Sequence, residues 1–344
     1  MAPSNKLLTQ ELARDLTDGN VCRELLSRGR RSQGCWEIEK IDGTKRIIKV
    51  SRLDKDVLAI NQQQMVGNII RSSSHYTLPE VQEIRINSKF MLTSYEYIQH
   101  QNFKWSDFRQ YSQGRRLALA AADFNTRNSA VENIAWLPKK EFKLGINAKK
   151  LQMILPQQSE EYCLQKTNLA KSIYGALLEK ASENNCFKSI GLAHNDLTPL
   201  NIGTTTNAVN ENQHSKSSII TRNLEREERD KQEKQESRKL LFLDLDNAVI
   251  SPLGTDLRFF VFAVAAQDNR IKYTKQMAEI YHTLAVHRHS ELSLGAVTSS
   301  AFLGYANAWL NLHRRTRSKH DQIRFENCLE FCQLALNEMI FNQT

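Results

Sequence analysis

The chain has 344 residues, of which 40% are hydrophobic and 25% are charged. This length suits one large domain or two lobes, and the apolar fraction can fill a hydrophobic core. The formal net charge of +9 suits an anionic ligand such as a nucleotide, a nucleic acid or an acidic membrane, and the alternative is a solvated basic surface.

Three features argue against a secreted or membrane-spanning protein. The N-terminal residues are amphipathic and mixed in charge, without the apolar core of a secretion signal. The most apolar run, residues 259–266, is much too short to cross a bilayer. The six cysteines are sparse and include no Cys-x-x-Cys pair, so we expect them to be reduced. We therefore predict a cytoplasmic protein.

The first hundred residues predict a small α+β lobe. Apolar periodicity predicts helices over residues 5–28 and 54–72, with a break in the first at Asp18-Gly19. Strands are predicted at four places: residues 36–41, 46–50, 80–87 and 89–98. The dipeptide Asp42-Gly43 is a hairpin turn signal between the first two strands. One helix among several antiparallel strands is the expected arrangement.

The rest of the chain is mainly helical in pattern. The run that begins at Leu117 (LALAAADF) indicates a buried helix. Further helices are predicted over residues 159–184, 256–268, 273–288, 294–317 and 320–341. Residues 205–238 have almost no large apolar side chains, and their seven basic and seven acidic residues balance. This segment is predicted to be a disordered, solvated insertion rather than a basic arm for nucleic acid.

Residues 191–203 (GLAHNDLTPLNIG) place polar groups at fixed steps within an apolar frame. Asp196 could accept a proton from a substrate, and Asn201, five residues later, offers a carboxamide oxygen to a metal ion. His194 could hydrogen-bond the loop and fix its shape. Residues 239–246 (KLLFLDLD) form a buried strand that ends in carboxylates, which would bring Asp244 next to Asn201 across a hairpin. Such a set of groups fits phosphoryl transfer, where positioning and charge neutralisation do most of the work.

These segments resemble the aminoglycoside phosphotransferase and choline kinase-like superfamily. Residues 194–201 (HNDLTPLN) match its His-x-Asp-x-x-x-x-Asn catalytic loop more closely than the protein-kinase loop, which begins His-Arg-Asp. Residues 243–248 (LDLDNA) are similar to its Ile-Asp-aromatic-acid segment. Residues 252–257 (PLGTDL) resemble its Gly-x-x-x-Asp-Leu element, which implies that Asp256 supports the catalytic loop.

The resemblance implies a two-lobed, protein-kinase-like α+β fold, with a small antiparallel-sheet N-lobe and a larger, mainly helical C-lobe. The lobes would comprise residues 1–98 and 99–344. In the C-lobe, Asp196 and His194 are the predicted catalytic residues. The predicted Mg²⁺ ligands are Asn201, Asp244 and Asp246; for Asp246, capping the strand end is the alternative. His194 is expected mainly to pin the loop.

The implied nucleotide site lies between the lobes. Lys49 matches the strand lysine that contacts the α- and β-phosphates of ATP, and the backbone of Glu96 and Ile98 would meet the adenine. The arginine-rich segment of residues 27–34 stands where a phosphate-covering loop belongs, although a solvated turn explains it equally well. The helix glutamate that usually pairs with the lysine is replaced by a glutamine-rich stretch, in which Gln63 or Gln64 could hydrogen-bond Lys49 without neutralising it.

The expected function is ATP- and Mg²⁺-dependent phosphorylation of a hydroxyl group on a small molecule. The alternative is a pseudokinase, a binding or scaffold module without turnover, which the glutamine-rich helix favours and the intact Asp-Asn-Asp set opposes. Protein phosphorylation is disfavoured, because no activation-loop and Ala-Pro-Glu segment follows Asp244. The expected partners are a nucleotide and a small-molecule acceptor, without nucleic acid. The acceptor's identity, the choice between ATP and GTP, and the oligomeric state do not follow from the sequence.

Overall fold

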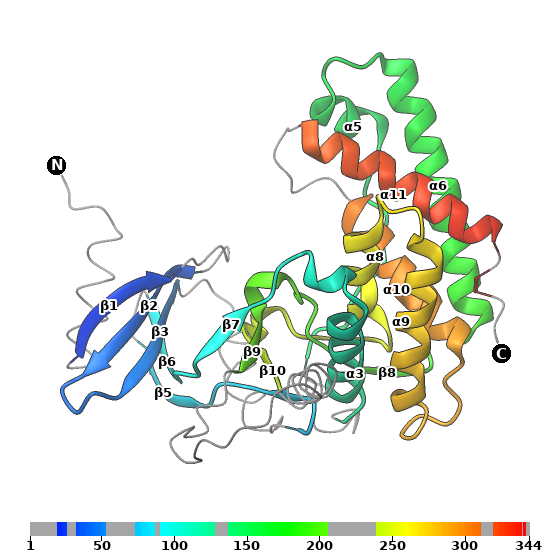
Figure 1. Cartoon of the computed structure of the whole chain (residues 1–344). Coiled ribbons are helices and arrows are strands. Elements are labelled where there is room, and N and C mark those ends of the chain that lie inside the picture. Colours follow the sequence, from blue (N-terminus) through cyan, green and yellow to red (C-terminus); the bar gives the residue numbers. More distant parts are fainter. Residues whose placement is uncertain are drawn as a thin grey trace, which may run out of the picture.

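The computed structural model describes residues 19–25, 32–52, 73–86, 90–127, 137–205, 239–310, 319–338 and 340–341. A five-stranded sheet stands at one end of the molecule and a group of helices at the other (Figure 1). Of the two smaller sheets, one lies between them and the other lies among the helices (Figure 1). This is the predicted two-lobed α+β architecture.

The N-terminal sheet is antiparallel, with strand order β1-β2-β3-β6-β5. Its strands are β1 (Gly19–Leu25), β2 (Ser32–Lys40), β3 (Lys45–Arg52), β5 (Val81–Ile86) and β6 (Phe90–Glu96). The predicted turn joins β2 to β3: Gly43 has φ 78°, and Asp42 accepts a hydrogen bond from the Thr44 amide at 2.9 Å.

The helix predicted over residues 5–28 is wrong in its last part, because residues 19–25 form β1 and pair with β2. The leucine spacing that suggested the helix runs across Asp18-Gly19, which ends the helical pattern. Pairing with β2 then satisfies the backbone of the following residues as a strand. Of the arginine-rich segment of residues 27–34, residues 32–34 belong to β2 and the others lie outside the described residues.

Alternating apolar side chains give the N-terminal sheet its buried face. Trp36 and Ile38 of β2, Ile48 and Val50 of β3, and Leu92 of β6 form one cluster. The period of two places all of them on the same side of the sheet. Lys49 alternates with this set and is 9% exposed.

Two small sheets build the centre of the molecule. The first has the order β4-β10-β9-β7, from β4 (Tyr76–Thr77), β10 (Leu240–Phe242), β9 (Ile202–Thr205) and β7 (His100–Asn102). The second pairs β8 (Ile190–Ala193) with β11 (Val249–Pro252). Residues 76–77, from the predicted N-lobe range, therefore pair with a strand of the predicted C-lobe.

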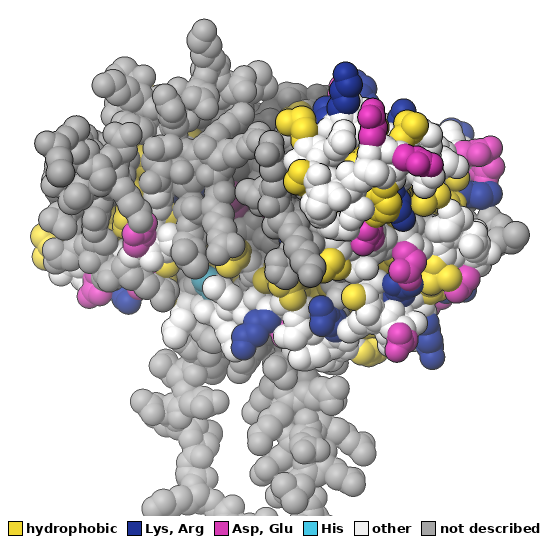
Figure 2. Space-filling view, turned by 90° about the horizontal axis from the view of Figure 1, so that it is seen from above, with side chains coloured by type: hydrophobic (Ala, Val, Ile, Leu, Met, Phe, Trp, Pro, Cys, Tyr) yellow, Lys and Arg dark blue, Asp and Glu magenta, His cyan; other side chains and the backbone are white. Residues whose placement is uncertain are grey.

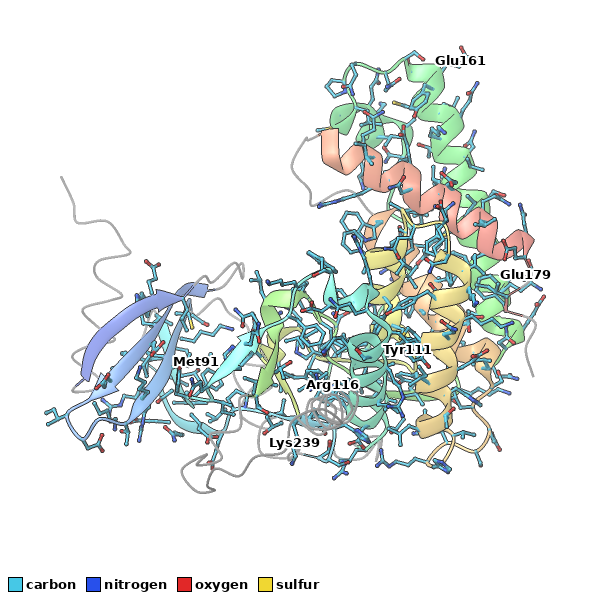
Figure 3. The ribbon with its side chains drawn as sticks, in the orientation of Figure 1. Met91, Tyr111, Arg116, Glu161, Glu179 and Lys239 are labelled. Atoms are coloured by element: carbon cyan, nitrogen blue, oxygen red, sulfur yellow. The ribbon has the colours of Figure 1, made fainter. Side chains whose placement is uncertain are left out.

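Most of the C-terminal part is helical, as predicted. The helices are α3 (Tyr111–Arg127), α5 (Ala148–Ile154), α6 (Glu160–Glu183), α8 (Arg258–Val264), α9 (Arg270–Ala285), α10 (Leu294–Trp309) and α11 (Lys319–Asn337). Helix α3 packs against α9, and α10 packs against α6, α8 and α11. Figure 3 labels Met91 in the five-stranded sheet and Tyr111 and Arg116 on α3, next to the small sheets.

The described residues do not include residues 5–18 of the first predicted helix, the predicted helix over residues 54–72, or residues 206–238 of the predicted insertion. The first residue of the insertion, Thr205, and the residue that follows it, Lys239, are described. The amide and the hydroxyl of Thr205 donate to the Lys239 carbonyl at 3.3 and 3.1 Å. The insertion therefore begins and ends at one point of the β9–β10 hairpin.

No helix in the described ranges is long and apolar enough to cross a membrane. Five cysteines with described side chains are free thiols, which fits the prediction of reduced cysteines. On the face shown in Figure 2, Lys and Arg side chains are interspersed with Asp and Glu over the described surface. The charge surplus therefore forms no large basic patch on the described part of that face.

Gly254 is required at the turn between β11 and α8. Its φ is +92°, and an added Cβ would lie 2.7 Å from the carbonyl oxygen of Val297. We expect Gly254→Ala to lower the free energy of unfolding by about 2–4 kcal/mol, from left-handed strain plus overpacking. Gly43→Ala is the matched control, because Gly43 has φ +78° and no atom within 4 Å of an added Cβ. Gly43→Ala should lower the free energy of unfolding only by the backbone strain, about 1–2 kcal/mol. If urea unfolding gives equal losses for Gly254→Ala and Gly43→Ala, the packing argument is contradicted.

Candidate active site

The predicted catalytic loop connects β8 to β9 and folds back on itself. The Asn201 side-chain amide donates to the Asp196 carbonyl at 2.8 Å, and the Thr198 amide donates to the same oxygen at 2.8 Å. Pro199 begins the short 3₁₀ turn Pro199–Asn201, where its fixed φ suits the first helical position. The turn brings Asn201 back to Asp196, although they are five residues apart.

His194 is fully buried and both of its ring nitrogens are engaged. Nε2 lies 2.8 Å from the Leu243 carbonyl, which can only accept, so Nε2 carries the proton. Nδ1 accepts from the Asp196 amide at 3.3 Å. The ring thus ties the loop to the end of β10, a geometry that favours the positioning role over direct proton transfer.

Asp256 supports the loop from the 3₁₀ turn Thr255–Leu257, as the resemblance implied. It is 1% exposed and accepts hydrogen bonds from the amides of His194 and Asn195 at 2.8 and 2.9 Å. Asn125, at the end of α3, donates to the same carboxylate at 3.0 Å and to the Leu192 carbonyl at 2.7 Å. This end of α3 is therefore part of the loop's support.

Asp244 lies directly after β10, as predicted. Phe242 pairs with Ile202, and the Leu243 amide donates to the Asn201 carbonyl at 2.9 Å, so Asp244 and Asn201 are brought together across the hairpin. Asp244 has φ 59°, a left-handed conformation that Asp adopts more readily than most residues. Asp246 lies in the 3₁₀ turn Leu245–Asn247, and its side chain is outside the described set.

Lys49 reaches from β3 to the catalytic residues. Its ammonium donates to Asp244 Oδ1 at 2.7 Å across a sequence separation of 195 residues. This ion pair joins the N-terminal sheet to the end of β10. Gln64, the predicted partner of Lys49, lies outside the described residues.

The surroundings of Asp196 raise the pKa of its carboxyl group. Burial is the largest cause, and the Asp244 carboxylate raises it further, whereas Arg258 and the Asn201 hydrogen bond lower it. A raised pKa makes a carboxylate a stronger base.

The two predicted adenine-contacting residues have backbone groups engaged within the protein. The Glu96 amide donates to the Glu80 carbonyl at 2.9 Å, and the Ile98 carbonyl lies 2.7 Å from His100 Nδ1. Residues 97–99 connect β6 to β7, so the chain does cross between the two parts at this point.

Three further side chains, which the sequence did not single out, contact the catalytic loop. Asn247 donates to Asp196 Oδ2 at 3.3 Å. Lys140 donates to Asn195 Oδ1 at 2.7 Å, and Arg258 donates to the same atom at 2.8 Å. Lys140 has no local signal, whereas Arg258 is the one charged residue of α8 (RFFVFAV) and follows the Asp-Leu pair directly.

No family model matches the sequence, and no curated protein matches it. Solved structures do match. An aminoglycoside phosphotransferase from Alicyclobacillus acidocaldarius has a TM-score of 0.57 at 10% identity, over 93% of this chain and 92% of that chain. A Plasmodium vivax ethanolamine kinase has a TM-score of 0.53 at 11% identity, over 92% of this chain and 83% of that chain.

An amicoumacin kinase in complex with AMP-PNP, Ca²⁺ and Ami gives a TM-score of 0.51 at 10% identity, over 99% of this chain and 98% of that chain. At these identities the likeness concerns the fold. All three structures are described as small-molecule kinases or phosphotransferases. The chain has the two-lobed, protein-kinase-like fold of the aminoglycoside phosphotransferase and choline kinase-like family.

Proposed function

We propose that the protein transfers the γ-phosphate of ATP to a hydroxyl group of a small molecule. The observation that carries this proposal is the convergence of Asp196, Asn201 and Asp244 at one loop and strand end. The order of these parts along the chain and the fold of the structural neighbours support it. A cytoplasmic location stays a prediction.

Asp196 is the proposed base. It would orient the acceptor hydroxyl and take its proton, while the acceptor oxygen forms a bond to the γ-phosphorus and the bond to the ADP oxygen breaks. The products are a phosphate monoester, ADP and a protonated Asp196, which returns its proton to solvent. Lys49 would contact the α- and β-phosphates.

The residues present fit a magnesium ion. Mg²⁺ prefers oxygen ligands, and the Asn201 nitrogen is held by the Asp196 carbonyl, so the amide oxygen is the atom left for the metal. The repulsion between Asp196 and Asp244 is what a divalent cation would relieve. Asn201 and Asp244 are the proposed ligands, with Asp246 as a further one, and the ion would neutralise phosphate charge when bound.

The decisive experiment combines nucleotide binding with acceptor screening. Mg²⁺–ATP and Mg²⁺–GTP are compared by thermal shift, since a ligand that binds only the folded state raises the melting temperature. ADP formation is then followed with a panel of alcohols. Failure to bind either nucleotide, together with no ADP formation with any alcohol, would reject the proposal.

One observation favours the second candidate, a nucleotide-binding module without turnover. Lys49 is bonded to Asp244, so the lysine intended for phosphates already contacts a proposed metal ligand. Binding of Mg²⁺–ATP without ADP formation for any acceptor would identify this candidate.

Lys49→Met is expected to weaken Mg²⁺–AMP-PNP binding by about 10- to 100-fold, the effect of losing a charge-assisted hydrogen bond to phosphate. Lys45→Met is the matched control, because Lys45 lies four residues before Lys49, on the same face of β3, and pairs with Glu37. The affinity of Lys45→Met for Mg²⁺–AMP-PNP, measured by titration calorimetry, should equal that of the wild type. Equal affinities for Lys49→Met and wild type would remove Lys49 from the nucleotide site.

A further inference from the structure

Two cationic side chains converge on one neutral atom beside the proposed base. Lys140 Nζ lies 2.7 Å and Arg258 Nη1 lies 2.8 Å from Asn195 Oδ1. The second Arg258 nitrogen, Nη2, donates to the Asn195 carbonyl. Asn195 immediately precedes Asp196 and has a left-handed φ of 62°, so the two cations meet at the residue that positions the base.

These cations are not neutralised by a direct ion pair within the described part of the chain. The Asp256 carboxylate influences the pKa of both, and its oxygens accept from the loop amides and Asn125. Ammonium and guanidinium groups carry three and five donors. The shared Asn195 oxygen and the Asn195 carbonyl account for one donor of Lys140 and two of Arg258.

Two like charges held together and half-buried are an unfavourable arrangement. Burial lowers the pKa of Lys140 well below its usual value, and the adjacent Arg258 lowers it further, while Asp256 raises it. Burial also lowers the pKa of Arg258, which Asp256 and Asp196 raise. A bound anion would relieve this repulsion, and such perturbed groups next to a base are typical of functional sites.

The two cations belong to the C-terminal part of the chain, away from the strand that carries Lys49. Lys140 lies in the segment that leads from α3 toward α5, and its amide donates to Ile250 of β11 at 2.8 Å. Arg258 begins α8 and rests on the Phe259 ring, with 4.7 Å from its guanidinium carbon to the ring centre. Lys49, by contrast, contacts Asp244. The cations and the nucleotide lysine thus approach the loop through different residues.

Building on the proposed function, we propose that Lys140 and Arg258 form an anion subsite for the acceptor. The acceptor is then an alcohol that carries a carboxylate or phosphate group near the reacting hydroxyl. Asn195 holds the two cations in place, and the next residue, Asp196, receives the hydroxyl proton. A cationic acceptor is disfavoured, because it would face two positive charges.

The test is ligand binding with the nucleotide site filled. Wild-type protein at saturating Mg²⁺–AMP-PNP is titrated in thermal-shift and calorimetric assays with glycerate and inorganic phosphate as anions, glycerol as the neutral match and choline as the cationic match. We expect at least one anion to raise the melting temperature and glycerol and choline to leave it unchanged. Lys140→Met should weaken anion binding by about 10- to 100-fold.

Lys139→Met is the matched control, because Lys139 is the exposed neighbour of Lys140 and should leave anion binding unchanged. Arg258→Lys keeps the positive charge but loses the planar guanidinium with its paired donors, so it should weaken anion binding less than Lys140→Met does. The subsite is rejected if neither anion stabilises the protein, if choline stabilises it as well as glycerate does, or if Lys140→Met binds anions normally. It is also rejected if Lys140→Met weakens AMP-PNP instead, which would assign the cations to the nucleotide phosphates.

The two proposals fail in different ways. If AMP-PNP does not bind but glycerate or phosphate still stabilises the wild type in a Lys140-dependent manner, the kinase proposal fails and the subsite stands. If ADP forms with neutral or cationic alcohols and not with hydroxy acids, the kinase proposal stands and the subsite fails.

Discussion

An Asp196→Asn variant is expected to lose turnover by about 10²- to 10⁴-fold, the usual contribution of a general base. The amide has nearly the shape of the carboxylate but accepts no proton at neutral pH. The loop contacts made by the Asp196 backbone with Asn201 and His194 do not depend on its side chain. The variant should therefore fold and bind nucleotide while its chemistry is slow.

The measurement is single-turnover ADP formation with the best acceptor from the screen, alongside the dissociation constant of Mg²⁺–AMP-PNP. Asp268→Asn is the matched control, since Asp268 is exposed and lies between α8 and α9. Turnover in Asp196→Asn within about threefold of the control would contradict general-base catalysis, because that change corresponds to less than 1 kcal/mol of barrier.

An Asp256→Asn variant is expected to lose about 3–5 kcal/mol of unfolding free energy, the cost of removing one partner from a buried, charged hydrogen-bond network. Asp256 accepts from two loop amides and from Asn125. An amide nitrogen at either position would face a donor instead of accepting from it. The substitution should therefore loosen the catalytic loop as well as lower the free energy of unfolding.

Urea unfolding gives the free energy, and hydrogen exchange of the His194 and Asn195 amides reports the loop directly. Both amides are expected to exchange faster in Asp256→Asn and at the wild-type rate in Asp268→Asn. A stability loss below about 1 kcal/mol would mean that the network tolerates a neutral acceptor, in the range of an ordinary hydrogen bond.

The parts of the site that the sequence could predict are those defined by local spacing. The five-residue step from Asp196 to Asn201 is closed by a single turn, and a buried strand directly precedes Asp244. Hydrophobic alternation likewise predicted the strands around Trp36 and Ile48. In each case, residues close together in sequence determine the structure.

The missed residues depend on contacts between distant segments. Lys140 meets Asn195 across 55 residues, and Arg258 meets it across 63. Nothing in the pattern around Lys140 distinguishes it from a surface lysine. Asn125 also escapes the sequence analysis, although its burial and its bonds to Leu192 and Asp256 make it part of the loop's support.

The error over residues 19–25 has a different origin. Leucines at helical spacing on both sides of Asp18-Gly19 were treated as one pattern, although the turn signal divides them. Strand β1 forms because its edge position beside β2 supplies backbone partners, a tertiary effect that overrides local periodicity.

Thr205 and Lys239 meet across the β9–β10 hairpin, so the segment between them is closed at its base. This segment can change in length or composition without altering the path of either strand, because closing a longer loop costs only about 0.6 kcal/mol for each doubling of its length. The same junction is a natural place to fuse a reporter domain. An affinity tag or fluorescent protein grafted there would keep Asn201 and Asp244 in register.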